Sequence, residues 1–324
     1  MNLKNELNAC FALTVEILLL SVFSVSAQLI PISYNLNNRT LINISAPHTE
    51  KIQNNFSPVH ELVILNRTQW TGLDQGLKWN GISYDINLDE NTRVGCNIYH
   101  ESFGPLKSLF VAGNYVYNLN INSSNQISGG ASIQYNLNQL NTSKASVTHP
   151  VDPLLENNPS TSFISFSPAV CYSGVIPSSD IGLVFGASYH NALNIEIGKF
   201  KAFTPLQVLV FNGSLIKFLS PGFRDVSSIE GGVVYRKYSS ISDDVQLYLK
   251  YNWHGKLNIR PGLRFGIAQE FGVHGLQMDI GFPLAKIFKL ERKIIDLNYV
   301  FELPFPSSPA AFGTTHEISL SVLF

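Results

Sequence analysis

Hydrophobic and polar side chains alternate along most of this chain. In residues 126–137 the alternate positions form two sets of opposite character, Gln126, Ser128, Gly130, Ser132, Gln134 and Asn136 against Ile127, Gly129, Ala131, Ile133, Tyr135 and Leu137. The same separation recurs in residues 245–254, 257–268 and 295–303. Successive side chains of a strand point to opposite faces, whereas a helical period of 3.6 would mix the two sets. The pattern therefore predicts strands with one apolar face and one wet face.

The alternating segments number about fourteen, an even number as is usual for bacterial barrels. They fall near residues 61–70, 78–88, 92–101, 109–120, 126–138, 162–173, 180–192, 205–218, 228–238, 244–254, 256–268, 270–282, 293–303 and 314–324. Many are long enough for the roughly 9–11 tilted residues that cross a bilayer, whereas strands of soluble domains have about 5–6 residues. We therefore predict an all-β fold, a transmembrane antiparallel β-barrel of about 14 strands over residues 61–324. A soluble β-sandwich of the lectin type is the alternative.

The connections and the aromatic side chains suit a barrel. Aromatic residues lie near the ends of the apolar sets, as in interfacial girdles, and they include Tyr115, Tyr117, Tyr135, Tyr189, Tyr251 and Trp253. If the first strand begins in the periplasm, tight turns fall on that side and longer connections fall outside. The expected turns are 89–91, 122–125, 177–179 and 255–256, and the expected longer connections are 102–108, 139–161, 193–204 and 304–313. Connections 219–227 and 283–292 are long for periplasmic turns.

The first 27 residues have the form of a secretory signal peptide. Lys4 precedes an apolar run over residues 10–25, and Ser26 and Ala27 supply small residues before a cleavage point at Gln28. An uncleaved anchor helix is the alternative, since Glu16 interrupts the run. We predict three parts, a signal peptide (1–27), a polar N-terminal segment (28–60) and an outer-membrane barrel (61–324). Cleavage would leave Cys96 and Cys171, which suit small residues of a barrel wall better than a disulfide scaffold.

Charge is scarce and balanced. Charged residues make up 14% of the chain, against roughly 25% in soluble domains, and the net charge of −1 gives no support for nucleic-acid binding. The expected lumenal positions carry both signs, at Arg93, Glu101, Glu230, Arg236, Lys250, Arg260, Arg264, Asp279, Asp296, Glu302 and Glu317. One interpretation is mutual neutralisation inside the barrel. The other is that Arg260 and Arg264 form a basic stripe for an acidic segment of a partner.

Catalytic motifs are not found in the sequence. It has no His-Glu-x-x-His, Gly-x-Ser-x-Gly, Cys-x-x-Cys, phosphate-binding loop or dinucleotide fingerprint. Ser188 and His190 share one face of a predicted strand, which suggests either a lumenal polar pair or part of a hydrolase, but the pair lacks the third group of a triad. We predict no enzyme activity, no cofactor, no metal and no catalytic residue. The long 139–161 connection is instead the candidate contact surface, with an unstructured loop as the alternative.

Several short motifs resemble the PorP/SprF family of type IX secretion membrane proteins. Residues 65–73 carry an Arg-x-Gln-Trp-x-Gly element, and three further elements follow in the family's order, Phe103-Gly104-Pro105-Leu106, residues 231–236 and residues 313–320. Near the N-terminus the chain departs from the family, because Ile44-Ser45-Ala46-Pro47 stands where members commonly carry an Asn-Pro-Ala-type element.

The resemblance implies an accessory of the type IX secretion system in the bacterial outer membrane. Its implied partners are outer-membrane lipid, other secretion components and a cognate exported surface protein, such as a gliding adhesin. An outer-membrane porin or hydrophobic-substrate transporter is the alternative function, and an outer-membrane hydrolase that uses Ser188 ranks third.

Overall fold

The computed structural model describes most of the chain from residue 39 onward. The described residues are 39–47, 60–73, 75–141, 160–176, 179–197, 205–219, 227–239, 243–253, 256–267, 271–284, 294–305 and 313–324. The predicted signal peptide and most of the 139–161 connection lie outside these ranges. Among the residues that are described, no helix has the length and hydropathy of a membrane span.

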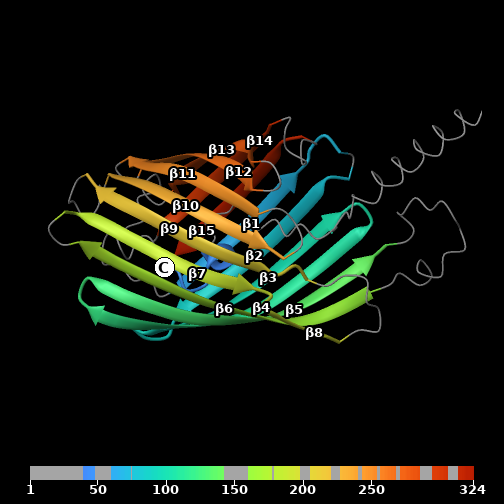
Figure 1. Cartoon of the computed structure of the whole chain (residues 1–324), viewed down its shortest axis with the longest axis horizontal. Coiled ribbons are helices and arrows are strands. Elements are labelled where there is room, and N and C mark those ends of the chain that lie inside the picture. The colour runs from blue at the N-terminus through green and yellow to red at the C-terminus, as the bar shows by residue number, and fades with distance from the viewer. Residues whose placement is uncertain are drawn as a thin grey trace, which may run out of the picture.

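Every predicted segment is a strand in the structure (Figure 1). The strands are β1 (His60–Gln69), β2 (Leu77–Asn87), β3 (Thr92–Phe103), β4 (Leu106–Asn122), β5 (Asn125–Leu140), β6 (Ser160–Ile176), β7 (Ile181–His190), β8 (Leu193–Glu196), β9 (Val208–Phe218), β10 (Ser228–Tyr238), β11 (Asp243–Trp253), β12 (Leu257–Ile267), β13 (Phe271–Pro283), β14 (Ile294–Pro304) and β15 (Thr315–Leu323). The period-two pattern thus located the wall of the molecule to within a few residues.

The strands close into one antiparallel barrel. Neighbours in sequence pair with one another from β1 to β7 and from β9 to β15, β7 pairs with β9, and β1 pairs with β15. Strand β7 pairs with residues 169–176 of β6, and β8 pairs with residues 163–166 of the same strand. Strands β7 and β8 therefore form one interrupted barrel strand, and the barrel has fourteen strands. Closure pairs every strand except the short β8 on both sides. A membrane interior requires such pairing because it supplies no hydrogen bonds. The predicted barrel is confirmed, and the β-sandwich alternative is wrong.

The seventh predicted strand, residues 180–192, is confirmed as β7, but the connection expected at 193–204 is wrong at its start, because residues 193–196 form strand β8. Asn191 has a left-handed backbone with φ of 54°, and its main-chain N–H donates to the side-chain oxygen of Ser167 on β6, at 2.9 Å, instead of to a main-chain carbonyl. Its side-chain amide donates to Leu206 O at 2.9 Å. The main chain of Asn191 is therefore not part of the ladder, which stops after His190 and resumes at Leu193.

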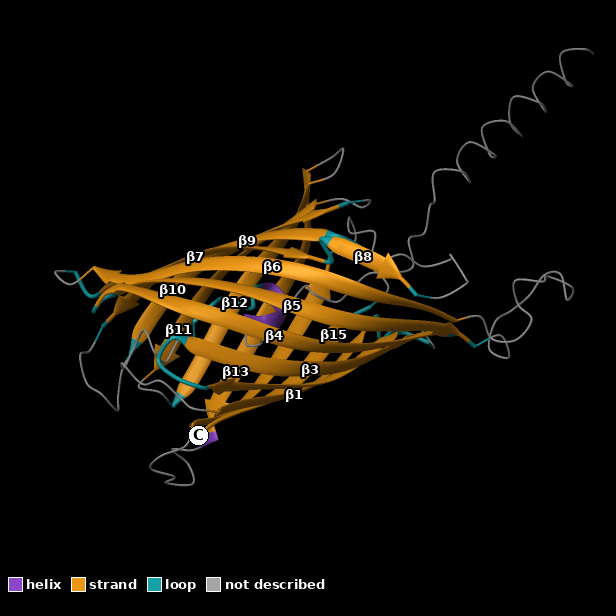
Figure 2. Ribbon diagram, turned by 90° about the horizontal axis from the view of Figure 1, so that it is seen from below, coloured by secondary structure: helices purple, strands orange, loops and turns teal. Residues whose placement is uncertain are grey.

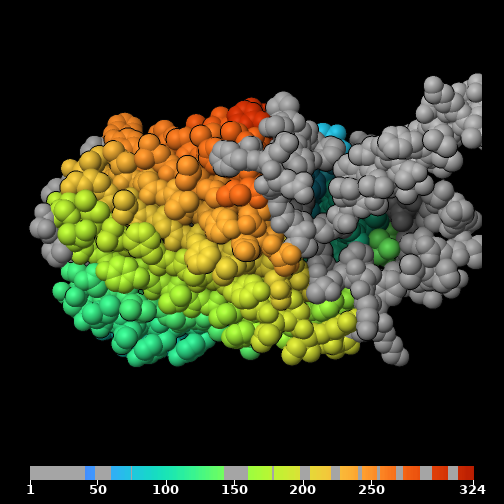
Figure 3. Space-filling view, in the orientation of Figure 1, coloured from blue at the N-terminus to red at the C-terminus, as the bar shows by residue number. Residues whose placement is uncertain are grey.

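The wall has an apolar outer face and a mostly polar inner face. The outward positions include exposed Ile82, Ile98, Ile133, Leu247 and Ile318, whereas buried Asn, Gln, Ser and charged side chains turn inward. Figure 3 shows one side of the wall as a continuous surface, from the green of β4 and β5 through yellow to the orange of β11–β13. Cys96 and Cys171 are free thiols within β3 and β6, as a wall position predicts. An apolar exterior is what contact with hydrocarbon demands.

The two ends of the barrel can be told apart by their connections. We call the end where β1 begins the His60 rim, and the end where β3 turns into β4 the Gly104 rim. The expected long connection 102–108 is wrong, because β3 and β4 meet in a tight turn at Gly104 and Pro105. Gly104 adopts φ of 55°, which glycine tolerates without steric cost. The placement of the His60 rim in the periplasm remains a prediction.

A short N-terminal segment lies inside the barrel (Figure 2). It consists of the single-turn helix α2 (Arg39–Ile42) and residues 43–46, and we call it the plug. Ile42, Asn43, Ile44 and Ser45 are all buried. Within the predicted polar N-terminal segment 28–60, this stretch is therefore packed against the lumenal wall.

Candidate functional site in the barrel lumen

The plug is anchored through its main-chain carbonyls. Ser188 Oγ donates to Ile42 O at 2.6 Å, and His190 Nε2 lies 3.0 Å from the same oxygen. Ser188 Oγ and His190 Nε2 are 3.1 Å apart. The pair predicted as a lumenal polar pair or a hydrolase fragment thus meets one peptide carbonyl and docks the plug against β7.

Arg93 of β3 provides the second anchor for carbonyls of the plug. Its Nη2 donates to Ile44 O and, at 3.3 Å, to Ala46 O. Arg93 was predicted as a lumenal charge, and the structure places its guanidinium against peptide oxygens of the plug. A guanidinium offers five donors in a rigid fork, so one side chain can hold two carbonyls.

Two plug side chains dock where the wall carries glycine. Asn43 Nδ2 donates to Val170 O at 3.0 Å and to Asn212 Oδ1 at 3.2 Å, and Ser45 Oγ donates to Ala169 O at 3.1 Å. A Cβ at Gly186 would stand 2.3 Å from Asn43 Nδ2, and a Cβ at Gly130 would stand 2.8 Å from Ser45 Oγ. The glycines leave the space that both side chains fill.

The helical turn of the plug spans the lumen between two apolar clusters. Leu41 packs against Leu65, Trp79 and Tyr99 of β1–β3, and Ile42 belongs to a cluster on the opposite side of the barrel. That second cluster comprises Leu206, Val208, Val210 and Val234 with Ile42. Polar docking and apolar packing together fix the plug, although the sequence around it has no alternating pattern.

Ion pairs fill the lumen on the other side of the barrel. Arg67 pairs with Glu317 at 3.2 Å and with Glu302 at 3.8 Å. Arg264 links Glu302 at 3.0 Å to Asp244 at 4.0 Å, and Arg236 meets Asp244 at 3.0 Å. Only 1% of the Arg67 and Glu317 side chains and 0% of the Arg236 side chain are exposed. Side chains that solvent does not reach cannot line an open pore at this level.

The ion-pair arrangement decides between the two interpretations of the lumenal charges. Arg260 pairs with Asp279, and Arg264 pairs with Glu302 and Asp244, so neither arginine presents an unpaired charge to a partner. Mutual neutralisation is therefore the correct interpretation for these two arginines. Arg67 and Asp244 were missing from the predicted lumenal set, although their positions on the buried parity of β1 and β11 would have indicated them.

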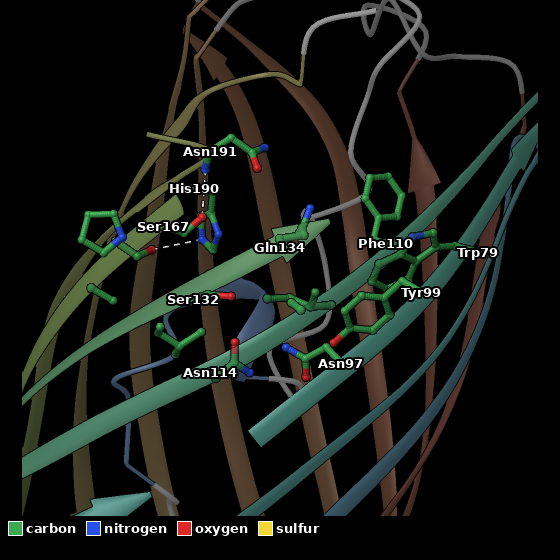
Figure 4. Close-up of a pocket in the computed structure, with 16 residues that line it drawn as sticks. Trp79, Asn97, Tyr99, Phe110, Asn114, Ser132, Gln134, Ser167, His190 and Asn191 are labelled. Atoms are coloured by element: carbon green, nitrogen blue, oxygen red, sulfur yellow. Dashed lines mark hydrogen bonds between the residues drawn. The ribbon is translucent and has the colours of Figure 1, made fainter. Parts of the chain in front are cut away.

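A cavity lies beside the plug, on the wall formed by β2–β7 (Figure 4). Its volume is about 60 Å³. The lining residues are Leu41, Ile44, Trp79, Asn97, Tyr99, Phe110, Ala112, Asn114, Ser132, Gln134, Ser167, Pro168, Ala169, Ser188, His190 and Asn191. No Asp, Glu, Lys or Arg is among them. Over the described residues, no cluster of three or more His, Cys, Asp or Glu side chains could hold a metal ion.

The fold and the lumen define the class of the protein, an outer-membrane type β-barrel whose interior is occupied by side chains and a plug. Solved structures of similar fold include the CymD monoaromatic hydrocarbon channel, with a TM-score of 0.45, 8% identity and coverage of 83% of this chain and 88% of that one. CdiB from Acinetobacter baumannii has a TM-score of 0.43 at 8% identity, and the match covers 83% of this chain but 60% of CdiB. A Pseudomonas aeruginosa FadL homologue has a TM-score of 0.42 at 9% identity, covering 88% and 96%.

The sequence identifies the family. The family model of the type IX secretion system membrane protein PorP/SprF matches residues 56–322, which include all the barrel strands except the last residue of β15. The chain belongs to the PorP/SprF family. No curated protein matches the sequence significantly.

Proposed function

We propose that this barrel is an accessory of the type IX secretion system that helps to export a cognate surface protein or to retain it at the cell surface. The observation that carries the proposal is the occupied lumen of a PorP/SprF barrel. Ion pairs with 0–1% exposed side chains fill one side, and the plug is docked on the other. A barrel filled in this way is suited to holding a partner rather than to conducting solutes.

The proposed mechanism divides the work between the outer wall and the rims. The apolar outer face holds the barrel in the outer membrane, which the chain reaches through the N-terminal signal at residues 1–27. The connections at the Gly104 rim then contact the exported protein, with 139–161 as the main contact. A rigid closed barrel fixes where each connection starts and ends. The exported protein of this proposal includes surface adhesins used for gliding.

Cell-surface retention tests the proposal. In the source bacterium, deletion of the gene should remove one exported protein from the surface, and tagged full-length barrel extracted in mild detergent should carry that protein through purification. A barrel lacking residues 143–158 should still insert but lose the co-purified protein. Unchanged surface proteins in the deletion strain, with nothing retained by the wild-type barrel, would contradict the proposal.

Transport is the second candidate function, and the aromatic lining of the cavity by Trp79, Tyr99 and Phe110 is the observation that favours it. A transporter of hydrophobic substrates would need a path past the plug. Uptake of a labelled aromatic hydrocarbon by vesicles containing the barrel, abolished when the plug is cross-linked to β6, would support transport over retention.

A further inference from the structure

Strands β1–β4 are consecutive in the wall (Figure 2), and their outer face changes from apolar to polar over three rows of side chains toward the Gly104 rim. The first row consists of lateral neighbours that are all exposed, Ile64, Ile82 and Ile98. One step nearer the rim, the lateral neighbours are Asn66, Asn80 and His100. The third row consists of Thr68, Lys78, Ser102 and Lys107. Charged side chains are tolerated on the outer face of a barrel only near the membrane interface, so the apolar layer ends between the first and third rows.

The third row brings two lysines to one hydroxyl group. Ser102 of β3 is the register partner of Lys78 on one side and of Lys107 on the other. Adjacent strands lie about 4.8 Å apart, so the Cα atoms of the two lysines are roughly 10 Å apart. Both lysines are exposed, and Ser102 is half-buried between them. The two long side chains can therefore reach one ligand placed over Ser102.

No acidic side chain of β1–β4 neutralises these lysines from the same face. The acidic residues of these four strands are Glu61, Asp85 and Glu101, and all three are buried on the lumenal side. His100, exposed in the second row, adds a basic group next to the lysines. The outer face is therefore electropositive at the level where the apolar layer ends, which is the level of lipid headgroups.

The chemistry and the position of the cluster suit a phosphorylated lipid. A phosphomonoester carries close to two negative charges at neutral pH, which two lysines balance, and its oxygens accept hydrogen bonds from ammonium and hydroxyl groups. Below the cluster, Ile98 and its register partner Val111 continue the exposed apolar face toward the middle of the barrel. Acyl chains gain contact with this apolar face, whereas a free phosphate ion or a phosphorylated peptide would not.

We propose that Lys78, Ser102 and Lys107 bind the phosphomonoester headgroup of a membrane lipid, whose acyl chains lie along the apolar side chains below them. The inference rests on the proposed function only for the membrane that surrounds the barrel, and it adds a specific lipid to the partners of that barrel. The binding itself is measured without the secretion system.

Native mass spectrometry of the full-length barrel in dodecylmaltoside micelles, titrated with dioleoyl phosphatidic acid, tests the proposal. A saturable adduct of one lipid is expected. A lysine near a membrane surface changes the affinity for anionic lipid about fivefold, so Lys78→Ala and Lys107→Ala should each weaken binding about fivefold and the double variant about 25-fold. The matched control is Lys237→Ala. Lys237 is an exposed lysine of β10 at the same rim, but its register partner on β9 is Leu209, and its removal should leave binding unchanged.

Two comparison ligands define the chemical class and its source. Dioleoyl phosphatidylcholine, which has no net charge, should bind at least about tenfold more weakly than phosphatidic acid, and inorganic phosphate in large excess should not displace the lipid. Equal affinity for the two lipids, unchanged binding by the folded double variant, or an equal loss in Lys237→Ala would overturn the proposal. Displacement by inorganic phosphate would overturn a lipid as the occupant.

Folding of each variant is checked by circular dichroism, and the two single variants decide the matter if the double variant does not fold. Absence of a saturable phosphatidic acid adduct, with an exported protein still retained at the cell surface, would refute this inference and leave the proposed function standing. Loss of retention with intact lipid binding would do the reverse.

Discussion

The two halves of the barrel wall line the lumen with different chemistry. Strands β10–β15 and β1, the ionic half, turn paired arginines and carboxylates inward. Strands β2–β7 and β9, the amide half, turn mainly Asn, Gln, Ser and glycine inward, and β4–β7 and β9 present no Asp, Glu, Lys or Arg on that face. The ionic half pairs its arginines with carboxylates of neighbouring strands. The amide half instead binds the plug, through the side chains of Ser188 and Arg93 and through wall carbonyls.

The ionic half should be the more sensitive to loss of one side chain. Arg67→Ala removes the cation of buried Glu317, and breaking a buried pair costs about 3–5 kcal/mol. Unfolding of the barrel by urea in lipid vesicles, followed by tryptophan fluorescence, measures this loss. Exposed Lys78 on the outer face is the control, since Lys78→Ala should change the free energy of unfolding by about 0.5 kcal/mol or less. Equal effects of the two substitutions would remove the distinction between the halves.

Substitution of the glycines that face the plug, Gly130 and Gly186, should have the next largest effect on the structure. Gly186→Ala places a Cβ 2.3 Å from Asn43 Nδ2 and 2.9 Å from Asn212 Oδ1, and overpacking of this kind costs about 1–3 kcal/mol. The plug should detach from the lumenal wall, so residues 41–46 should become accessible to protease. The matched variant is Gly129→Ala, where a Cβ meets nothing within 4 Å and the plug should stay protected. Protection of the plug in both variants would show that its docking does not depend on the glycine space.

A smaller effect is expected at a single plug anchor. Ser188→Ala removes the hydrogen bond to Ile42 O, and a hydrogen bond contributes about 0.5–1.5 kcal/mol. Hydrogen exchange of the Asn43 and Ile44 amides should accelerate, while the barrel strands stay protected. Ser319→Ala in the ionic half is the control, because its buried hydroxyl has no hydrogen bond among the described residues. A lipase activity lost only in Ser188→Ala would instead revive the hydrolase interpretation.

The wall of the molecule was predictable because strand periodicity is local. The segment predicted at 228–238 is strand β10 with the same bounds, since its two faces meet different solvents throughout. Pairing of the lumenal charges was not predictable in the same way. Arg260 lies opposite Asp279 only once the register of β12 on β13 is set, and a shift of one residue would put the two side chains on opposite faces of the wall.

The position of the plug and the cavity beside it could not be predicted from the local pattern of hydrophobic and polar residues. Asn43 and Ser45 stand in an Asn-rich polar stretch and become fully buried through contacts with residues more than 100 positions away. Inward glycines at 130 and 186 were the available signal, because a glycine on the buried parity marks a close approach of another segment. The register that brings these positions together across the lumen is set by closure of the whole barrel.

Single-channel recording of the purified wild-type protein in a planar bilayer tests the central claim most directly. A lumen closed by the ion pairs and the plug predicts membranes with inserted, folded barrels and no steady ion conductance. Stable, ohmic current steps in the wild-type protein, equal to those of a variant lacking residues 39–46, would contradict that account.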